Sequence, residues 1–199
     1  MPTLVCLGDS ITAKDRDPSG ILKLTPRLQE KLPNWIIINA GISGDNTKNA
    51  LIRLKTDVLS YNPDLVTVLL GTADASENKG IEIQEYEQNL TSIVEQITPQ
   101  KTLLITSPPI NQNLLLIRKK LSPKSNFVTM RKLGQYVAVM NKVASSTGSH
   151  FLDLWSIMLS QRNYYKFLKL KDGVHFNEKG YEFFTPLLSQ KIKWVYSNI

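Results

Sequence analysis

The sequence predicts an α/β fold in which a five-stranded parallel sheet carries helices on both faces. Short apolar segments without polar alternation recur along the chain, which is typical of strands buried on both faces. Longer segments with helical spacing of apolar residues separate them, and a repeated strand–helix–strand order favours a parallel sheet. The length of 199 residues and the 42% hydrophobic content fit a single domain over 1–199.

Five segments are expected to form the strands because they are too short for helices. They are Thr3–Leu7, Trp35–Asn39, Leu65–Leu70, Thr102–Thr106 and His150–Leu152. The predicted helices are about Thr25–Leu32, Thr47–Leu59, Gln84–Ile97, Phe127–Ser146 and Glu178–Tyr196. Pro33, Pro63 and Pro99 each follow a proposed helix and agree with its end. The last helix is expected to be interrupted near Pro186, because proline has no N–H to donate.

One segment, 107–126, lacks a regular pattern. Three prolines surround its apolar run Leu114–Ile117, which predicts a long loop or a short helix over the sheet edge. Long loops in compact domains are often functional, and this apolar run is a candidate wall for a ligand groove.

Charge and cysteine content limit the classes of partner. The formal charge of +7 comes from scattered basic residues, and the only cluster is Arg118–Lys120, so nucleic-acid binding is not expected. No apolar run approaches the length of a membrane span. The N-terminus lacks a signal-peptide pattern, and the single Cys6 is expected to be a buried, inert thiol. These features predict a cytoplasmic protein and leave its oligomeric state open.

Small and polar residues follow the predicted strands. The segments Gly8–Thr12, Asn39–Asn46 and Gly71–Asp74 come after the first three strands, and Asp172–Phe176 precedes the last helix. In an open parallel sheet, ligands bind at the carboxyl ends of the strands. We therefore expect Gly, Ser, Asp and His residues from distant parts of the chain to meet at one rim of the sheet.

Ser10, His175 and Asp172 have the residue types of a nucleophilic triad. A serine hydroxyl becomes a useful nucleophile when a histidine accepts its proton, and that histidine needs a carboxylate on its other ring nitrogen. The three-residue spacing of Asp172 and His175 allows this contact in a turn. Glycines at 8, 41 and 71 permit tight turns whose N–H groups can face an oxyanion.

Each of these residues also has a structural explanation. Ser10 could cap a following helix, Asp172 could be a turn residue, and His175 could be a satisfied core histidine. His150, the other imidazole, is interpreted as a strand-start residue. Structural roles are also expected for a further set: loop acceptors Asp9, Asp45 and Asp74, core residues Trp155 and Trp194, and a solvated cluster of Lys166, Lys169 and Lys171.

Competing motifs are absent or incomplete. Gly41–Asp45 misses the G-x-S-x-G elbow by one residue, and neither a dinucleotide nor a P-loop glycine pattern is present. Two histidines and one cysteine, without H-E-x-x-H, do not make a zinc pattern. The prediction is therefore an enzyme without a metal or a cofactor.

The ordered blocks GDSIT at Ser10, NAGISGDNT at Gly41, the block at Gly71–Asp74 and DGVHF near the end resemble the GDSL, or SGNH, hydrolase family. The likeness is greatest to its small bacterial acylhydrolases and isoamyl-acetate-esterase-like members. It implies a three-layer, flavodoxin-like α/β/α fold with Ser10, Asp172 and His175 as triad. It also implies that Ser10 and Gly41 supply oxyanion N–H groups, and that the substrate is a small-molecule carboxylic ester hydrolysed through an acyl-enzyme.

One position departs from that family. Its third block reads Gly-x-Asn-Asp, and the Asn side chain is a third oxyanion donor, whereas this chain has Ala73. Asp74 is no replacement because it is negatively charged, and Thr72 is expected to point away if the strand continues. Ala73 is either a natural variation or an engineered one, and both predict reduced activity. The alternative is a catalytically silent module that binds an acyl or acetylated ligand.

Overall fold

A computed structural model describes residues 1–198 and contains one five-stranded parallel sheet. The strands are β1 Thr3–Gly8, β2 Ile36–Gly41, β3 Leu65–Leu69, β4 Thr102–Ile105 and β5 His150–Leu152. Their order is β2-β1-β3-β4-β5, and every neighbouring pair is parallel. All five lie where the sequence predicts them. From β1 the chain adds β2 on one side of the sheet and then β3, β4 and β5 on the other side. A crevice is therefore expected between β1 and β3, beyond the carboxyl ends of these two strands.

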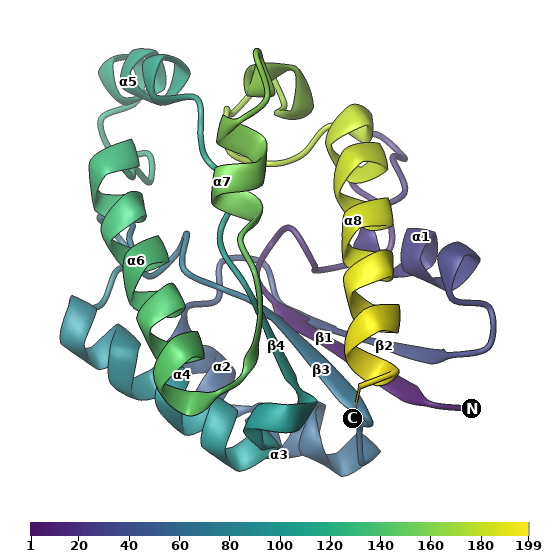
Figure 1. Cartoon of the computed structure of the whole chain (residues 1–199). Coiled ribbons are helices and arrows are strands. Elements are labelled where there is room, and N and C mark those ends of the chain that lie inside the picture. The colour runs from purple at the N-terminus through teal and green to yellow at the C-terminus, as the bar shows by residue number, and fades with distance from the viewer. Residues whose placement is uncertain (199) are drawn as a thin grey trace.

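Helices cover both faces of the sheet (Figure 1). The α-helices are α1 Leu24–Lys31, α2 Thr47–Ile52, α3 Leu54–Asp57, α4 Ile83–Ile97, α5 Gln112–Leu121, α6 Met130–Thr147, α7 Leu154–Leu159 and α8 Glu178–Tyr196. The first buried cluster joins the sheet to α2, α3, α4 and α6, and the second joins it to α1, α7 and α8. The predicted three-layer arrangement is therefore confirmed.

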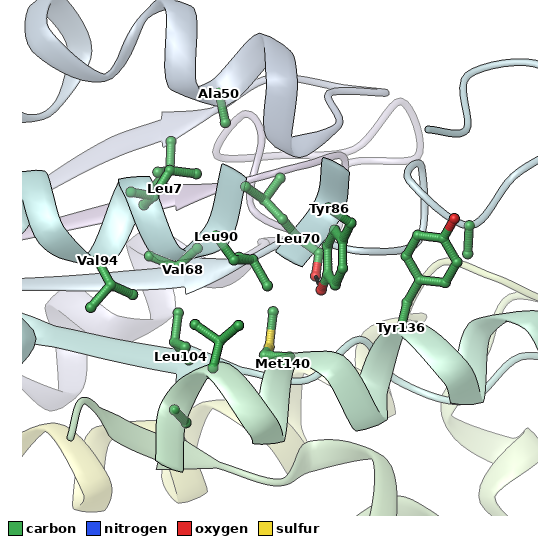
Figure 2. Close-up of a cluster of buried hydrophobic side chains, with 14 of the residues drawn as sticks. Leu7, Ala50, Val68, Leu70, Tyr86, Leu90, Val94, Leu104, Tyr136 and Met140 are labelled. Carbon is green, nitrogen blue, oxygen red and sulfur yellow. Dashed lines mark hydrogen bonds between the residues drawn. The ribbon is translucent and has the colours of Figure 1, made fainter. Parts of the chain in front are cut away.

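The two faces of β1 and β3 explain their nearly continuous apolar sequences. Every residue of β3 is buried, and so is every residue of β1 after Thr3. Figure 2 shows the first cluster, where Leu90 of α4 and Met140 of α6 approach Val68 and Leu104 of the sheet. Cys6 points into the second cluster, and burial raises the pKa of its thiol to about 12, so it is inert as predicted.

In this part of the fold two helix predictions and one burial prediction are wrong. The helix expected over 47–59 is divided at Arg53, which has non-helical backbone angles and whose guanidinium binds Asp45 and Asp57. Helix α8 continues through Pro186, because the face on both sides of the proline is buried in the second cluster. Trp194 on this helix is 55% exposed and is not a core residue.

The segment 107–126 contains the short helix α5, Gln112–Leu121, and a short helix was one of the two forms expected for it. None of the helices within residues 1–198 combines the length and the apolar character that a bilayer crossing requires.

Candidate active site

Ser10 lies in a tight turn directly after β1. The carboxylate of Asp9 accepts a hydrogen bond from the N–H of Ile11 (2.9 Å), and the N–H of Ala13 donates to the Asp9 carbonyl (2.9 Å). The turn does not continue into a helix, so Ser10 is not a helix cap. The buried Lys23 donates from Nζ to the carbonyl oxygen of Ser10 (2.6 Å) and to that of Ala13. The backbone around the hydroxyl is therefore held from two sides.

Ser10, His175 and Asp172 form one hydrogen-bonded chain. The distance from Ser10 Oγ to His175 Nε2 is 2.7 Å, and that from His175 Nδ1 to Asp172 Oδ2 is 3.0 Å. The other carboxylate oxygen, Asp172 Oδ1, accepts from the N–H groups of Val174 (2.8 Å) and His175 (2.9 Å). The Asp-x-x-His spacing thus forms a turn in which one carboxylate binds both the backbone and the imidazole.

The charge state of Asp172 suits this arrangement. Burial alone would raise its pKa, but the hydrogen bonds and the charge of His175 outweigh burial and lower the pKa to about 2. Asp172 is therefore ionised at neutral pH, orients the His175 ring and stabilises its protonated form. His175 Nε2 then faces the hydroxyl of Ser10 and can accept its proton.

His150 lies at the opposite end of the sheet, at the start of β5 as predicted. Its Nε2 is 3.1 Å from the carbonyl oxygen of Gln100, and its ring meets Trp194 edge-on. His150 therefore takes no part in the chain at Ser10.

A cavity of about 460 Å³ opens beside Ser10 and His175. Its lining includes four apolar residues, Leu115, Phe127, Val128 and Val174, which we call its apolar wall, and three cationic residues, Lys79, Arg118 and Lys171. Leu115 belongs to the apolar run that the sequence marks as a candidate groove wall, whereas Phe127 and Val128 were expected to lie in a helix. They precede α6, which begins at Met130. The cavity fits a small apolar group placed next to the hydroxyl.

Gly41 and Gly44 have different positions relative to this cavity. The N–H of Gly41 donates to Asn39 Oδ1 (3.0 Å), and Gly41 does not line the cavity. A Cβ at Gly41 would lie 2.4 Å from the N of Ala13, so glycine is needed there for close packing against the Ser10 turn. The predicted oxyanion role of Gly41 therefore conflicts with the geometry.

Gly44 does line the cavity, together with Ser10. Its φ of +82° favours glycine, and within residues 1–198 its N–H and that of Ser10 donate no hydrogen bond. The sequence signal that could have identified Gly44 is its place in Ser43-Gly44-Asp45, three residues before α2 begins at Thr47. Two free N–H groups at one cavity wall are able to bind a developing negative charge.

Ala73 also borders the cavity, and it is 6% exposed. Its methyl group leaves this wall without a side-chain donor. Thr72 lines the cavity too, contrary to expectation, because β3 ends at Leu69 and the alternation of the strand does not reach Thr72. Asp74 is fully buried and lies outside the cavity.

Asp74 connects the loop after β3 to the start of α2. Its Oδ1 accepts from the N–H (2.7 Å) and the hydroxyl (2.6 Å) of Thr47, while Oδ2 is buried without a hydrogen-bond partner among residues 1–198. Burial raises the pKa of Asp74 to about 6, and that of Asp9 also to about 6. Asp9 and Asp74 are thus structural acceptors, as predicted, whose ionisation opposes folding.

Replacing Asp74 with asparagine is expected to stabilise the protein increasingly as pH rises. A carboxyl whose pKa is higher in the folded chain favours folding below the unfolded pKa, and this contribution is lost as pH rises through about 6. The gain of Asp74→Asn over the unchanged chain should grow by about 2 kcal/mol between about pH 4 and about pH 7.5. Urea unfolding across this range measures it. A cost of the amide that does not depend on pH cancels when two pH values are compared. A difference in unfolding free energy between the two chains that stays constant with pH would therefore contradict the raised pKa of Asp74.

Two of the three lysines expected on a solvated face line a second cavity. Lys169 and Lys171 belong to a space of about 740 Å³ that also borders Ser10 and His175, and Lys169 forms an ion pair with Asp17. Among residues 1–198 no group of three His, Cys, Asp or Glu side chains is arranged as metal ligands would be.

Comparisons with known proteins agree with this geometry. A model of the GDSL-like lipase/acylhydrolase family matches residues 6–183. The human isoamyl acetate-hydrolyzing esterase 1 homolog is 30% identical over 96% of this chain and 83% of its own length. A lipase/acylhydrolase from Enterococcus faecalis superposes with a TM-score of 0.85 at 29% identity, over 97% of this chain and 96% of that one. A variant of an acetyl xylan esterase from Geobacillus stearothermophilus superposes with a TM-score of 0.71 at 25% identity, over 96% and 94%.

The family match covers the segments that hold Ser10, Asp172 and His175. The similar structures share the five-stranded α/β fold over nearly the whole chain. This chain belongs to the GDSL-like lipase/acylhydrolase family and is an esterase of that family.

Proposed function

We propose that the protein hydrolyses short-chain carboxylic esters through an acyl-enzyme on Ser10. The observation that carries this proposal is the chain of hydrogen bonds from Asp172 through His175 to the Ser10 hydroxyl. The chain lies in a cavity that an ester can enter. Such an arrangement supplies a nucleophile, a base and an orienting carboxylate at one point.

In the first half of the reaction, Ser10 Oγ forms a bond to the ester carbonyl carbon while its proton passes to His175 Nε2. The tetrahedral intermediate collapses when the carbon–oxygen bond to the alcohol breaks, and the imidazolium of His175 gives its proton to the leaving oxygen. In the second half a water molecule, deprotonated by His175, attacks the acyl-serine. The acid leaves and Ser10 regains its proton.

The negative charge of the intermediate needs donors beside Ser10. We assign this role to the N–H groups of Ser10 and Gly44, which border the cavity and are free of other acceptors within the described residues. The side chain at position 73 adds no third donor, since alanine cannot form a hydrogen bond. Turnover is therefore expected to be slow, because a preorganised donor acts chiefly on the transition state.

The acyl group is assigned to the cavity of about 460 Å³ with the apolar wall of Leu115, Phe127, Val128 and Val174. This size suits acetyl to butyryl groups and short branched chains. The names of two similar proteins point in the same direction, because they refer to isoamyl acetate and to acetyl xylan, which are both acetate esters.

A fluorophosphonate probe tests the nucleophile directly. The probe should label the protein at Ser10, because it needs a serine activated by a base, and mass spectrometry of the labelled peptide identifies the position. Ser10→Ala should remain unlabelled, while Ser43→Ala, which changes another serine at the cavity, should be labelled like the unchanged chain. Labelling of Ser10→Ala to the same extent would remove Ser10 from the mechanism.

Ala73 is the observation that favours the second candidate, a silent module that binds an acyl or acetylated ligand. A silent module would neither react with the probe nor hydrolyse p-nitrophenyl acetate, yet it would still bind acetate esters. If the protein is an esterase, both labelling by the probe and hydrolysis of p-nitrophenyl acetate should occur, however slowly. The same labelling experiment therefore separates the two candidates.

A further inference from the structure

Two cavities meet at Ser10 and His175. The first has the apolar wall described above and shares Lys171 with the second. The second, of about 740 Å³, extends between the loop 13–23 and the segment 169–172. Five cationic side chains and two carboxylates line this second space, so its net charge is strongly positive. An ester bound across Ser10 would place one of its two parts in each cavity.

Three of the five cations in the second cavity already have partners. Lys169 is paired with Asp17, Arg16 donates from Nη1 to the carbonyl of Gly20 (2.8 Å), and Lys23 binds the carbonyls of Ser10 and Ala13. Within residues 1–198, neither Lys14 nor Lys171 takes part in an ion pair or a hydrogen bond. These two ammonium groups are therefore available to a ligand.

The loop that carries Lys14 is held in shape. Asp17 Oδ1 accepts from the N–H groups of Ser19 (2.9 Å) and Ile21 (2.9 Å), and the ion pair between Asp17 and Lys169 ties the loop to the segment that carries Lys171. Lys14 itself has a φ of +63°, a conformation that glycine or asparagine adopts at lower cost. Strain of this kind is concentrated at binding sites, where the surrounding structure enforces it.

We propose that the second cavity binds the alcohol part of the ester and that this part carries an anionic group, a phosphate or a carboxylate, held by Lys14 and Lys171. The proposal rests on the proposed function and adds the substrate class. The acyl group is placed in the first cavity because of its apolar wall. Lys79 and Arg118, which also line that cavity, donate to the carbonyls of Gly44 and Asp172. Lys171 borders both cavities and Lys14 only the second, so the second cavity alone offers an anion two ammonium groups without partners among the described residues. His175 borders both cavities, so it can still protonate the leaving oxygen.

Three chromogenic esters test the substrate class: p-nitrophenyl acetate, 4-acetoxy-3-nitrobenzoate and p-nitrophenyl hemisuccinate. They are respectively neutral, anionic on the alcohol side and anionic on the acyl side. After division by each ester's rate of alkaline hydrolysis, kcat/KM for 4-acetoxy-3-nitrobenzoate should exceed that for p-nitrophenyl acetate about tenfold at low salt. The ratio should approach one in about 0.5 M NaCl, because exposed charges are screened. The hemisuccinate should show no such advantage.

Lysine variants locate the effect. Lys14→Gln and Lys171→Gln should each lower the anionic-to-neutral ratio about threefold, and the double variant should remove the preference. Lys55→Gln removes the same charge from α3, at a residue that lines neither cavity, and should leave the ratio unchanged. Equal rates for the anionic and neutral esters, a preference for the hemisuccinate, or a preference that survives both substitutions would overturn the proposal.

Binding measurements keep this test separate from catalysis. Calorimetric titration of Ser10→Ala with glycerol 3-phosphate, glycerate and glycerol should show binding of one or both anions but not of glycerol. The stronger of the two identifies a phosphate or a carboxylate. This binding should be lost in Ser10→Ala that also carries Lys14→Gln and Lys171→Gln. If no ester is hydrolysed but an anion binds and its binding depends on the two lysines, the proposed function fails and the anion site stands. If neither anion binds, the anion site fails.

Discussion

Replacing His175 with alanine is expected to lower kcat for p-nitrophenyl acetate by about 10⁴ to 10⁶, because removal of one triad member disables the unit. In the structure His175 Nε2 is the group that faces Ser10 Oγ, at 2.7 Å, and Asp172 holds its other nitrogen. Without the imidazole, the serine keeps its proton and the leaving oxygen receives none. Steady-state kinetics of the purified variant measure the loss.

His150→Ala is the matched control, since it removes the other histidine of the chain. His150 contacts Gln100 and Trp194 at the far end of the sheet, so kcat should stay within about threefold of its starting value. The double variant Ser10→Ala with His175→Ala should be no slower than either single variant, because the two act as one unit. Equal losses at His175 and His150, or additive losses at Ser10 and His175, would reject the assignment.

Replacing Ala73 with asparagine is expected to raise kcat by about 10² to 10³. Removing one oxyanion donor usually lowers kcat by this factor, and the substitution would add such a donor. Ala73 borders the cavity beside Ser10, and the wall at this position holds only a methyl group. An amide there adds an N–H that binds the oxyanion more strongly than the ester carbonyl. The gain should therefore appear in kcat, with a smaller change in KM.

Two controls show whether that gain comes from the intermediate. In a chain with Ser10→Ala the substitution Ala73→Asn should bring no increase, because no oxyanion forms without the nucleophile. Ala73→Leu should not increase kcat either, since it fills the same space without a donor. An unchanged kcat in soundly folded Ala73→Asn would mean that another group already supplies the third donor.

The sequence predicted most of the fold because the strands are encoded locally. The segments of β1 and β3 are apolar throughout, and both are buried on two faces in the structure. Boundaries that depend on neighbours were wrong. Pro186 does not stop α8, since packing against the second cluster outweighs the lost hydrogen bond, and the helix over 47–59 divides where Arg53 turns to bind Asp45.

For the candidate active site too, some features could be predicted from the sequence and others could not. The sequence by itself determined which residue types follow each strand, and hence the candidates Ser10, Asp172 and His175, because a parallel sheet brings these ends together. It could not distinguish Gly41 from Gly44, since only the structure shows that the Asn39 side chain occupies the N–H of Gly41 and that Gly44 lines the cavity. Nor could it show that Lys14 and Lys171 share a cavity, because residues so distant in sequence meet only through the ion pair of Asp17 and Lys169 and the packing around it. Those contacts, and the charge that they leave free beside Ser10, were decided by the tertiary structure alone.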